Sequence, residues 1–253
     1  MNKEMHKQLI ELLKELHLPM FREYYAELAK KAISNEFGYE DYLYELTQRE
    51  CQVRRDNKIV RLVKASKLPL EKTLQTFDLK RLPLKIRRQL DVLLDGTFVG
   101  RCENILAFGR PGSGKTHLLC AICHELARQG KRVCFVSCDL MVQELLRAKQ
   151  ELKLDKWLKK LSQYDALMID DFGYVKQNRE EMEVLFTLLA HRYERGSVLI
   201  TSNLPFSKWE QIFKDPMTTA AAIDRLVHHS VILELNVPSY RAEEAQKRKT
   251  VDM

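Results

Sequence analysis

The chain has 253 residues and a formal net charge of +7, with 45% hydrophobic and 30% charged residues. This length suits one medium α/β domain with a smaller appendage, and the composition is ordinary for a globular protein. No apolar stretch approaches the ~18 residues that a bilayer span needs, and the N-terminus is an amphipathic, charge-rich pattern unlike a signal peptide. We therefore expect a cytoplasmic protein with no membrane partner.

The N-terminal part is predicted to be all-helical. Apolar periodicity and breakers predict helices over residues 2–17, 20–33 and 39–66, separated by Pro19 and by a loop at 34–38. Pro69 ends the third helix, and a linker then leads to a short basic helix at 84–93. The expected organisation is a helical domain over 1–70, a linker with the basic helix over 71–100, and a larger domain over 101–253.

Positive charge is concentrated in residues 49–101, which hold 14 Lys and Arg against 6 Asp and Glu. In the third predicted helix, Arg54, Lys58 and Arg61 share one face, and the apolar residues gather on the other: Val53, Ile59, Val60 and Val63. A basic ridge on an amphipathic helix is typical of a site for a polyanion. A merely solvated helix face is the alternative.

Residues 109–116 fit the pattern G-x-x-x-x-G-K-[ST] between an apolar run at 104–108 and a helical stretch at 117–129. A phosphate-binding loop requires this strand–loop–helix context, because glycines aim backbone N–H groups at the phosphates and the helix start adds its dipole. Lys115 is expected to reach the β- and γ-phosphates, and Thr116 to ligate Mg²⁺. A chance glycine-rich turn is the alternative. The predicted ATP-site residues are Gly109, Arg110, Pro111, Gly112, Ser113, Gly114, Lys115, Thr116 and His117.

A second motif indicates hydrolysis as well as binding. The apolar run at 166–169 ends in Asp170 and Asp171, the Walker B arrangement in which a buried strand delivers carboxylates to the phosphates. Asp170 is the candidate for holding Mg²⁺, and Asp171 for orienting or deprotonating the attacking water. A solvated turn is the alternative. Related ATPases more often carry glutamate at the second position, which leaves the hydrolysis rate open.

Apolar runs at 104–108, 132–137, 166–169, 197–201 and 231–235 alternate with helical segments and predict a parallel sheet with helices on both faces. Asn203 follows the fourth run, where it could contact the γ-phosphate or its water. Arg225 lies on a helix before the last run. It could pair with Asp215 or Asp224, or project into a neighbouring subunit's nucleotide as an arginine finger.

The six cysteines raise the question of a metal site, especially Cys120 and Cys123 followed by Cys134 and Cys138. The first two fall on the helix after the phosphate-binding loop, and Cys134 falls in an apolar strand. We therefore expect small buried hydrophobic side chains and no metal cluster.

The segments at 116–118, 169–173, 200–206, 224–229 and 239–241 together resemble the IstB family, the ATPase helpers of insertion-sequence transposition. This family is related to the DnaC-type helicase loaders of the AAA+ superfamily, and the resemblance covers nearly the whole chain. It implies an α/β AAA+ P-loop NTPase with a parallel five-stranded sheet, preceded by a small helical domain. No C-terminal lid domain is expected, because 18 residues follow Leu235.

The resemblance also implies roles. Asn203 matches sensor I, Arg225 the arginine finger, and Arg241 a sensor II arginine that contacts phosphate. The implied function is ATP-dependent assembly of a ring or spiral homo-oligomer on double-stranded DNA, with recruitment or stimulation of a transposase. The implied cofactors are ATP and Mg²⁺. DNA contacts, mostly to phosphates, are expected from Arg54, Arg55, Lys58, Arg61, Lys176 and Arg179.

Two other functions share the same phosphate-binding loop. A helicase loader would hand its N-terminal domain to a replicative helicase, through an interface including Tyr24, Tyr25, Leu28 and Phe37. A small-molecule kinase would need a lid and an acceptor pocket, and the sequence gives evidence of neither.

Overall fold

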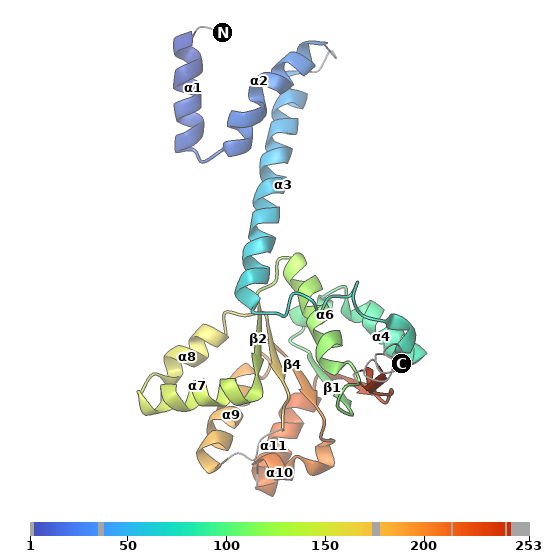
Figure 1. Cartoon of the computed structure of the whole chain (residues 1–253). Helices are drawn as coiled ribbons and strands as arrows, with labels where there is room; N and C mark the ends of the chain where they lie inside the picture. The colour runs from blue at the N-terminus through green and yellow to red at the C-terminus, as the bar shows by residue number, and fades with distance from the viewer. Residues whose placement is uncertain (1–2, 35–37, 174–177, 214, 241, 244–253) are drawn as a thin grey trace, which may run out of the picture. The chain divides into compact units, whose positions relative to one another are not determined.

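The computed structural model describes residues 3–34, 38–173, 178–213, 215–240 and 242–243 (Figure 1). The chain forms two compact units, Met1–Arg61 and Leu62–Met253. Each unit is described separately below, and the predicted domain limits stay predictions. In the described part of the chain, no helix is long and apolar enough to cross a membrane.

The N-terminal unit contains α1 (Lys3–Glu15), α2 (Pro19–Ser34) and most of α3 (Tyr39–Ser66), which confirms the three predicted helices. Its small core is formed by one buried leucine from each helix, namely Leu13, Leu28 and Leu46. Val60 was expected on the apolar face of α3 but is 65% exposed, because the buried side chains of α3 in this unit lie earlier in the helix.

A buried carboxylate joins the three helices of this unit. Glu50 of α3 is 4% exposed and accepts hydrogen bonds from the Met20 backbone N–H (2.9 Å) and from Arg54 Nε (2.8 Å). Arg54 Nη2 also donates to the His17 carbonyl in the turn between α1 and α2 (2.5 Å). Glu50 therefore stabilises the first turn of α2, where backbone N–H groups lack helical partners.

The second unit is built on a five-stranded sheet in the order β2-β3-β4-β1-β5, with every neighbouring pair parallel. The five predicted strands are confirmed to within one residue at each end: β1 (Asn104–Gly109), β2 (Val133–Ser137), β3 (Ala166–Asp170), β4 (Ser197–Ser202) and β5 (Ser230–Leu235). The connections are helical, as parallel pairing requires. The α/β fold expected from the alternating pattern is thus confirmed.

Helices cover both faces of the sheet (Figure 1). One core layer contains α4 (Leu84–Leu93), α5 (Thr97–Gly100) and α6 (Lys115–Arg128). The other contains α7 (Cys138–Gln150), α8 (Leu154–Leu161), α9 (Arg179–Arg192), α10 (Glu210–Phe213) and α11 (Pro216–Val227). Alternate residues of each strand face opposite layers: Met168 packs in the first and Ile169 in the second. Short 3₁₀ turns, η1 (Leu79–Arg81) and η2 (Phe206–Lys208), complete the unit.

The amino ends of the strands are held by two buried polar side chains. Arg192, 2% exposed, donates through Nη1 to the carbonyls of Leu161 (3.1 Å) and Tyr164 (2.8 Å) and through Nη2 to those of Asp165 (3.3 Å) and Ser197 (2.9 Å). Asn104 accepts from Val198 N–H (2.9 Å) and donates to the Leu226 carbonyl (3.1 Å). These bonds satisfy backbone groups that the strand ends leave without ladder partners.

The cysteines are placed as the sequence predicted. Cys120 and Cys123 of α6 are fully buried, and each Sγ lies 3.9 Å from Met168 Sδ. Burial raises the pKa of the Cys120 thiol to about 12. Cys138 is buried and Cys134 is partly buried. Burial of this kind is typical of cysteines that pack as small hydrophobic groups, whereas Cys51 is exposed and Cys102 is partly buried.

Candidate nucleotide-binding site

The phosphate-binding loop lies between β1 and α6, at the carboxyl ends of the strands, where open α/β sheets bind their ligands. Gly109 and Gly112 have positive φ angles, 155° and 78°. A Cβ on Gly112 would lie 2.1 Å from Ser239 Oγ, and one on Gly109 would lie 2.5 Å from the Leu235 carbonyl oxygen. The loop therefore requires glycine at these positions for both conformation and space.

Lys115 and Ser113 supply polar groups inside the loop. Lys115 is 7% exposed, and its Nζ donates to the carbonyls of Gly109 (2.8 Å) and Arg110 (3.0 Å). Ser113 Oγ is buried and lacks a hydrogen-bond partner among the described residues. Buried polar groups are normally satisfied, so this hydroxyl marks the loop as a place for a polar ligand.

Asp170 is oriented by two hydroxyl groups from other elements. It ends β3, is 8% exposed, and accepts through Oδ1 from Thr116 Oγ1 of α6 (2.8 Å) and from Thr201 Oγ1 of β4 (2.6 Å). Thr116 and Asp170, paired in this way, present the hard oxygen ligands that Mg²⁺ prefers. Sequence reasoning missed Thr201, although this residue ends the fourth apolar run, two residues before the predicted Asn203.

Asp171, the predicted catalytic carboxylate, is exposed and has a left-handed backbone with φ 56°. Its N–H donates to Thr201 Oγ1 (2.9 Å). A non-glycine residue in this conformation costs roughly 1–2 kcal/mol, and such strain concentrates at functional sites. Thr201 therefore orients both acidic residues: it bonds the carboxylate of Asp170 and the backbone N–H of Asp171.

A cavity of about 380 Å³ brings most predicted residues together. Asn203 also lines it, and Asn203 Oδ1 is buried without a partner among the described residues. Lys72 and Tyr240 line the cavity as well and were not predicted, although Tyr240 lies in one of the family-like segments. The predicted residues that line it are Pro111, Gly112, Gly114, Lys115, Thr116, His117, Asp170, Asp171 and Asn203.

The linker that precedes the sheet packs beside the phosphate-binding loop. His117 Nε2 lies 3.0 Å from the Thr73 carbonyl oxygen and 3.1 Å from Thr76 Oγ1, and its ring meets the Phe77 ring edge-on at 5.0 Å. Burial lowers the pKa of His117, which favours the neutral imidazole. A smaller cavity of about 220 Å³, lined by Phe77, Arg81 and Tyr240 among others, adjoins the loop at Ser113 and Gly114. Its aromatic lining suits a planar base.

Arg225 lies outside both cavities. Its Nη1 donates to the Ala221 carbonyl one turn earlier in α11 (3.0 Å), and its guanidinium lies 4.9 Å from the centre of the Phe186 ring. Within the described part of the chain, Arg225 makes no ion pair with Asp215 or Asp224. Asp215 instead caps α11 by accepting from Thr218 N–H (2.6 Å). The salt bridge considered from the sequence is therefore not formed.

The predicted DNA-contacting residues have mixed surroundings. Arg54 is bound to Glu50 and to the His17 carbonyl, whereas Lys58 is exposed. Arg179 begins α9 with its side chain 90% exposed, 3.8 Å from Glu183. Arg55 donates to Gln52 Oε1 (3.1 Å) and Arg61 to the Asn57 carbonyl (3.2 Å). The predictions for Lys176 and Arg241 fall outside the described residues.

A family model described as IstB-like ATP binding protein matches residues 11–249. The chain belongs to this family. An insertion-sequence ATP-binding protein of Geobacillus stearothermophilus is 37% identical over 95% of this chain and 96% of its own length. One from Pseudomonas aeruginosa is 36% identical, covering 93% of this chain and 89% of its own. The family that the sequence segments predicted is thus confirmed.

Solved structures agree with the fold. The DnaC helicase loader matches with a TM-score of 0.57 at 19% identity, covering 65% of this chain and 97% of that one. AMPPCP-bound DnaA from Aquifex aeolicus matches with a TM-score of 0.57 at 18% identity, covering 74% of this chain and 57% of that one. At such identities the likeness establishes the AAA+ fold alone. The family match, in turn, makes the chain an IstB-like ATP-binding protein.

Proposed function

We propose that this protein is an ATP-dependent transposition helper that assembles on double-stranded target DNA and recruits or stimulates the transposase of its insertion sequence. The observation that carries the proposal is the pairing of Thr116 with Asp170 beside the phosphate-binding loop. Thr116, Asp170 and a second carboxylate, Asp171, line one cavity, and the first two offer oxygens that would suit a divalent cation. Such an arrangement serves nucleotide hydrolysis as well as binding.

The residues present fit ATP with Mg²⁺. Ser113 Oγ and Asn203 Oδ1 are buried and lack partners among the described residues. The Ser113 hydroxyl could donate to a phosphate oxygen, and Asn203 Oδ1 could accept from an ordered water. Thr116 and Asp170 would hold Mg²⁺, which offsets the negative charge of the phosphates when bound. Lys115 would bind phosphate oxygens, and Asn203 and Asp171 would orient the attacking water, with Asp171 accepting its proton.

Hydrolysis is proposed to depend on assembly, because the cavity of one protomer does not include Arg225. A cation supplied by a neighbouring copy would stabilise the transferring phosphoryl group only after the two subunits dock. The proposed homo-oligomer is a ring or spiral with nucleotide at each subunit boundary. The Arg225 side chain is partly exposed and lies over Phe186, so it can reorient toward a partner.

DNA binding is proposed to use backbone phosphates and to have little sequence preference. The basic segment at 49–101 supplies the charge, with Lys58 and Arg61 exposed on α3. Each phosphate contact releases condensed counterions, which makes the affinity strongly salt-dependent. Replacing Arg54, Lys58 and Arg61 together should lower the salt slope by up to about 3 units. An unchanged salt slope would mean that the basic ridge on α3 is only a solvated helix face. Arg179 and Lys176 would then be the candidate DNA contacts.

The proposed partner follows from the relatives, whose names place them in insertion sequences. The transposase of such an element is the partner expected for this chain. A pull-down with tagged protein, ATP and duplex DNA should retain a transposase. Retention of a replicative helicase in its place would support the helicase-loader alternative.

The experiment that tests the catalytic proposal is phosphate release from ATP, with and without duplex DNA, by wild type and Asp171→Asn. The variant should bind ATP normally but hydrolyse it about 10²–10⁴-fold more slowly, the usual contribution of a general base. Asp139→Asn, an exposed acidic residue on α7, is the matched control. Unchanged turnover in Asp171→Asn would place the catalytic carboxylate elsewhere.

A further inference from the structure

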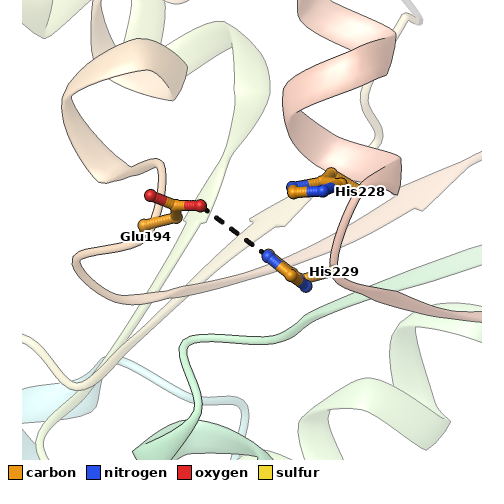
Figure 2. A group of neighbouring side chains, drawn as sticks. All are labelled: Glu194, His228 and His229. Carbon is orange, nitrogen blue, oxygen red and sulfur yellow. Dashed lines mark ion pairs between the residues drawn. The ribbon is translucent and has the colours of Figure 1, made fainter.

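A cluster of three side chains lies apart from the nucleotide cavity, where the loop after α9 meets the end of α11 (Figure 2). Glu194, His228 and His229 are all exposed, and one ligand atom from each lies within 4.8 Å of the others. The Glu194 carboxylate and His229 Nε2 are 3.7 Å apart. The family-like segment at 224–229 contains both histidines, but neither has a role in the functions described above.

We propose that Glu194, His228 and His229 form a binding site for one divalent transition-metal ion, of which Zn²⁺ is the best match. Two imidazoles and one carboxylate are a ligand set that suits this ion, with a water at the fourth position. Zinc–ligand bonds of about 2.0–2.1 Å place tetrahedral ligand atoms about 3.4 Å apart. The Glu194–His229 separation of 3.7 Å is close to this value, and side-chain rotations would bring the three ligand atoms, now within 4.8 Å of one another, to it.

The backbone under the cluster is held in place by the buried amino ends of the strands. The turn that carries Glu194 is fixed by Arg192, whose carbonyl accepts from the N–H groups of Arg195 (3.0 Å) and Gly196 (3.2 Å). Glu194 itself has a left-handed backbone, φ 55°. On the other side, the His229 carbonyl accepts from Asn104 N–H (2.7 Å). Rigid supports of this kind lower the entropic cost of gathering the ligands.

His228 also has the outer contact that metal-binding histidines commonly make. Its Nδ1 lies 2.9 Å from the Tyr193 hydroxyl. When Nδ1 carries the proton and donates it to this oxygen, Nε2 presents its lone pair for a metal. The nearby Glu103 is occupied, because both of its oxygens accept from Arg101 (2.7 and 2.9 Å). A bound ion would thus tie the start of the α9–β4 connection to the end of α11, three residues after Arg225.

Calorimetric titration of the nucleotide-free protein with ZnCl₂ tests the proposal. Wild type should bind one ion per chain, and its unfolding temperature should rise with Zn²⁺ because the ion binds the folded state. His228→Gln/His229→Gln should lose the binding and the temperature shift. Tyr193→Phe, which removes the outer contact, should weaken binding about 10-fold. His17→Asn, which removes an exposed imidazole outside the cluster, is the control and should bind as wild type does.

A second measurement keeps the test decisive if the glutamine variants do not fold. Co²⁺ should give a visible spectrum of four-coordinate type with wild type, and Glu194→Cys should add a sulfur-to-cobalt charge-transfer band that wild type lacks. Absence of that band, no Zn²⁺ uptake by wild type, or equal uptake by the double-glutamine variant would each overturn the proposal.

Discussion

The two edges of the same sheet use buried polar groups in opposite ways. At the amino ends, Arg192 and Asn104 bond to backbone groups of the protein itself, so the polarity stabilises the fold. At the carboxyl ends, Ser113 and Asn203 have buried oxygens that find no partner within the described ranges, and Asp171 has a strained backbone. One edge thus stabilises the domain, and the other is organised to bind a ligand at some cost in stability.

The largest effect is expected at the amino edge. Arg192→Leu should lower the free energy of unfolding by about 4 kcal/mol, because several buried carbonyls lose a charged donor. Denaturant unfolding measures the loss, and ATP affinity per folded molecule should be unchanged. Arg195→Leu, on the exposed part of the same turn, is the control. A loss below about 1 kcal/mol would mean that this edge is not stabilised in the way described.

Arg225→Ala tests whether ligand binding is confined to the carboxyl edge. Arg225 precedes β5, at the amino edge, yet it is proposed to act on the nucleotide of a neighbouring subunit. The variant should bind ATP normally and hydrolyse it up to ~10³-fold more slowly. Mixing it with Lys115→Ala should restore activity, since one interface then pairs an intact loop with an intact finger. If the two variants co-assemble but stay inactive, the action in trans is excluded.

Lys115→Ala tests whether the carboxyl edge binds phosphate. Loss of a cationic donor to phosphate, at about 1.5–3 kcal/mol, should weaken ATP binding about 10- to 10²-fold and prevent ATP-dependent assembly. Thermal stability without nucleotide should change little, because Lys115 donates to two carbonyls of its own loop. Fluorescent-nucleotide titration measures the affinity, with Lys156→Ala, an exposed residue on α8, as control. Wild-type affinity in Lys115→Ala would contradict the assignment of the loop.

Gly112→Ala is expected to lower stability by less than Arg192→Leu does. The added methyl group meets Ser239 Oγ and requires φ 78°, so we expect a loss of about 1–2 kcal/mol. Adding Ser239→Gly to this variant should recover the steric part and leave the backbone part. If the single variant is as stable as wild type, the loop is looser than the contacts indicate.

The strands and the phosphate-binding loop could be predicted from the sequence because their signals are local. Apolar runs end in polar residues, and the glycines have a fixed spacing before Lys115. Thr201, Lys72 and Tyr240 could not be assigned in this way, since their roles depend on contacts between separate parts of the chain. Lys72 and Tyr240 line the cavity, and Thr201 bonds Asp170 from the neighbouring strand. Arg192 was missed for the same reason: in a helical pattern it resembles any exposed arginine, and its partners come from other segments.

The contacts between the linker and α6 have a thermodynamic consequence. The Pro69 and Thr73 carbonyls lie 3.0 Å from His124 and His117, and Phe77 packs on Gly114 within the loop itself. The chain that follows α3 is therefore joined to the residues that hold phosphate. Suppose that bound nucleotide changes the equilibrium between a docked and a displaced linker by some factor. Displacing the linker must then change the nucleotide affinity by that same factor, because coupling between two equilibria is reciprocal. ATP affinity in His124→Gln, which alters a linker contact of α6 outside both cavities, would measure this coupling.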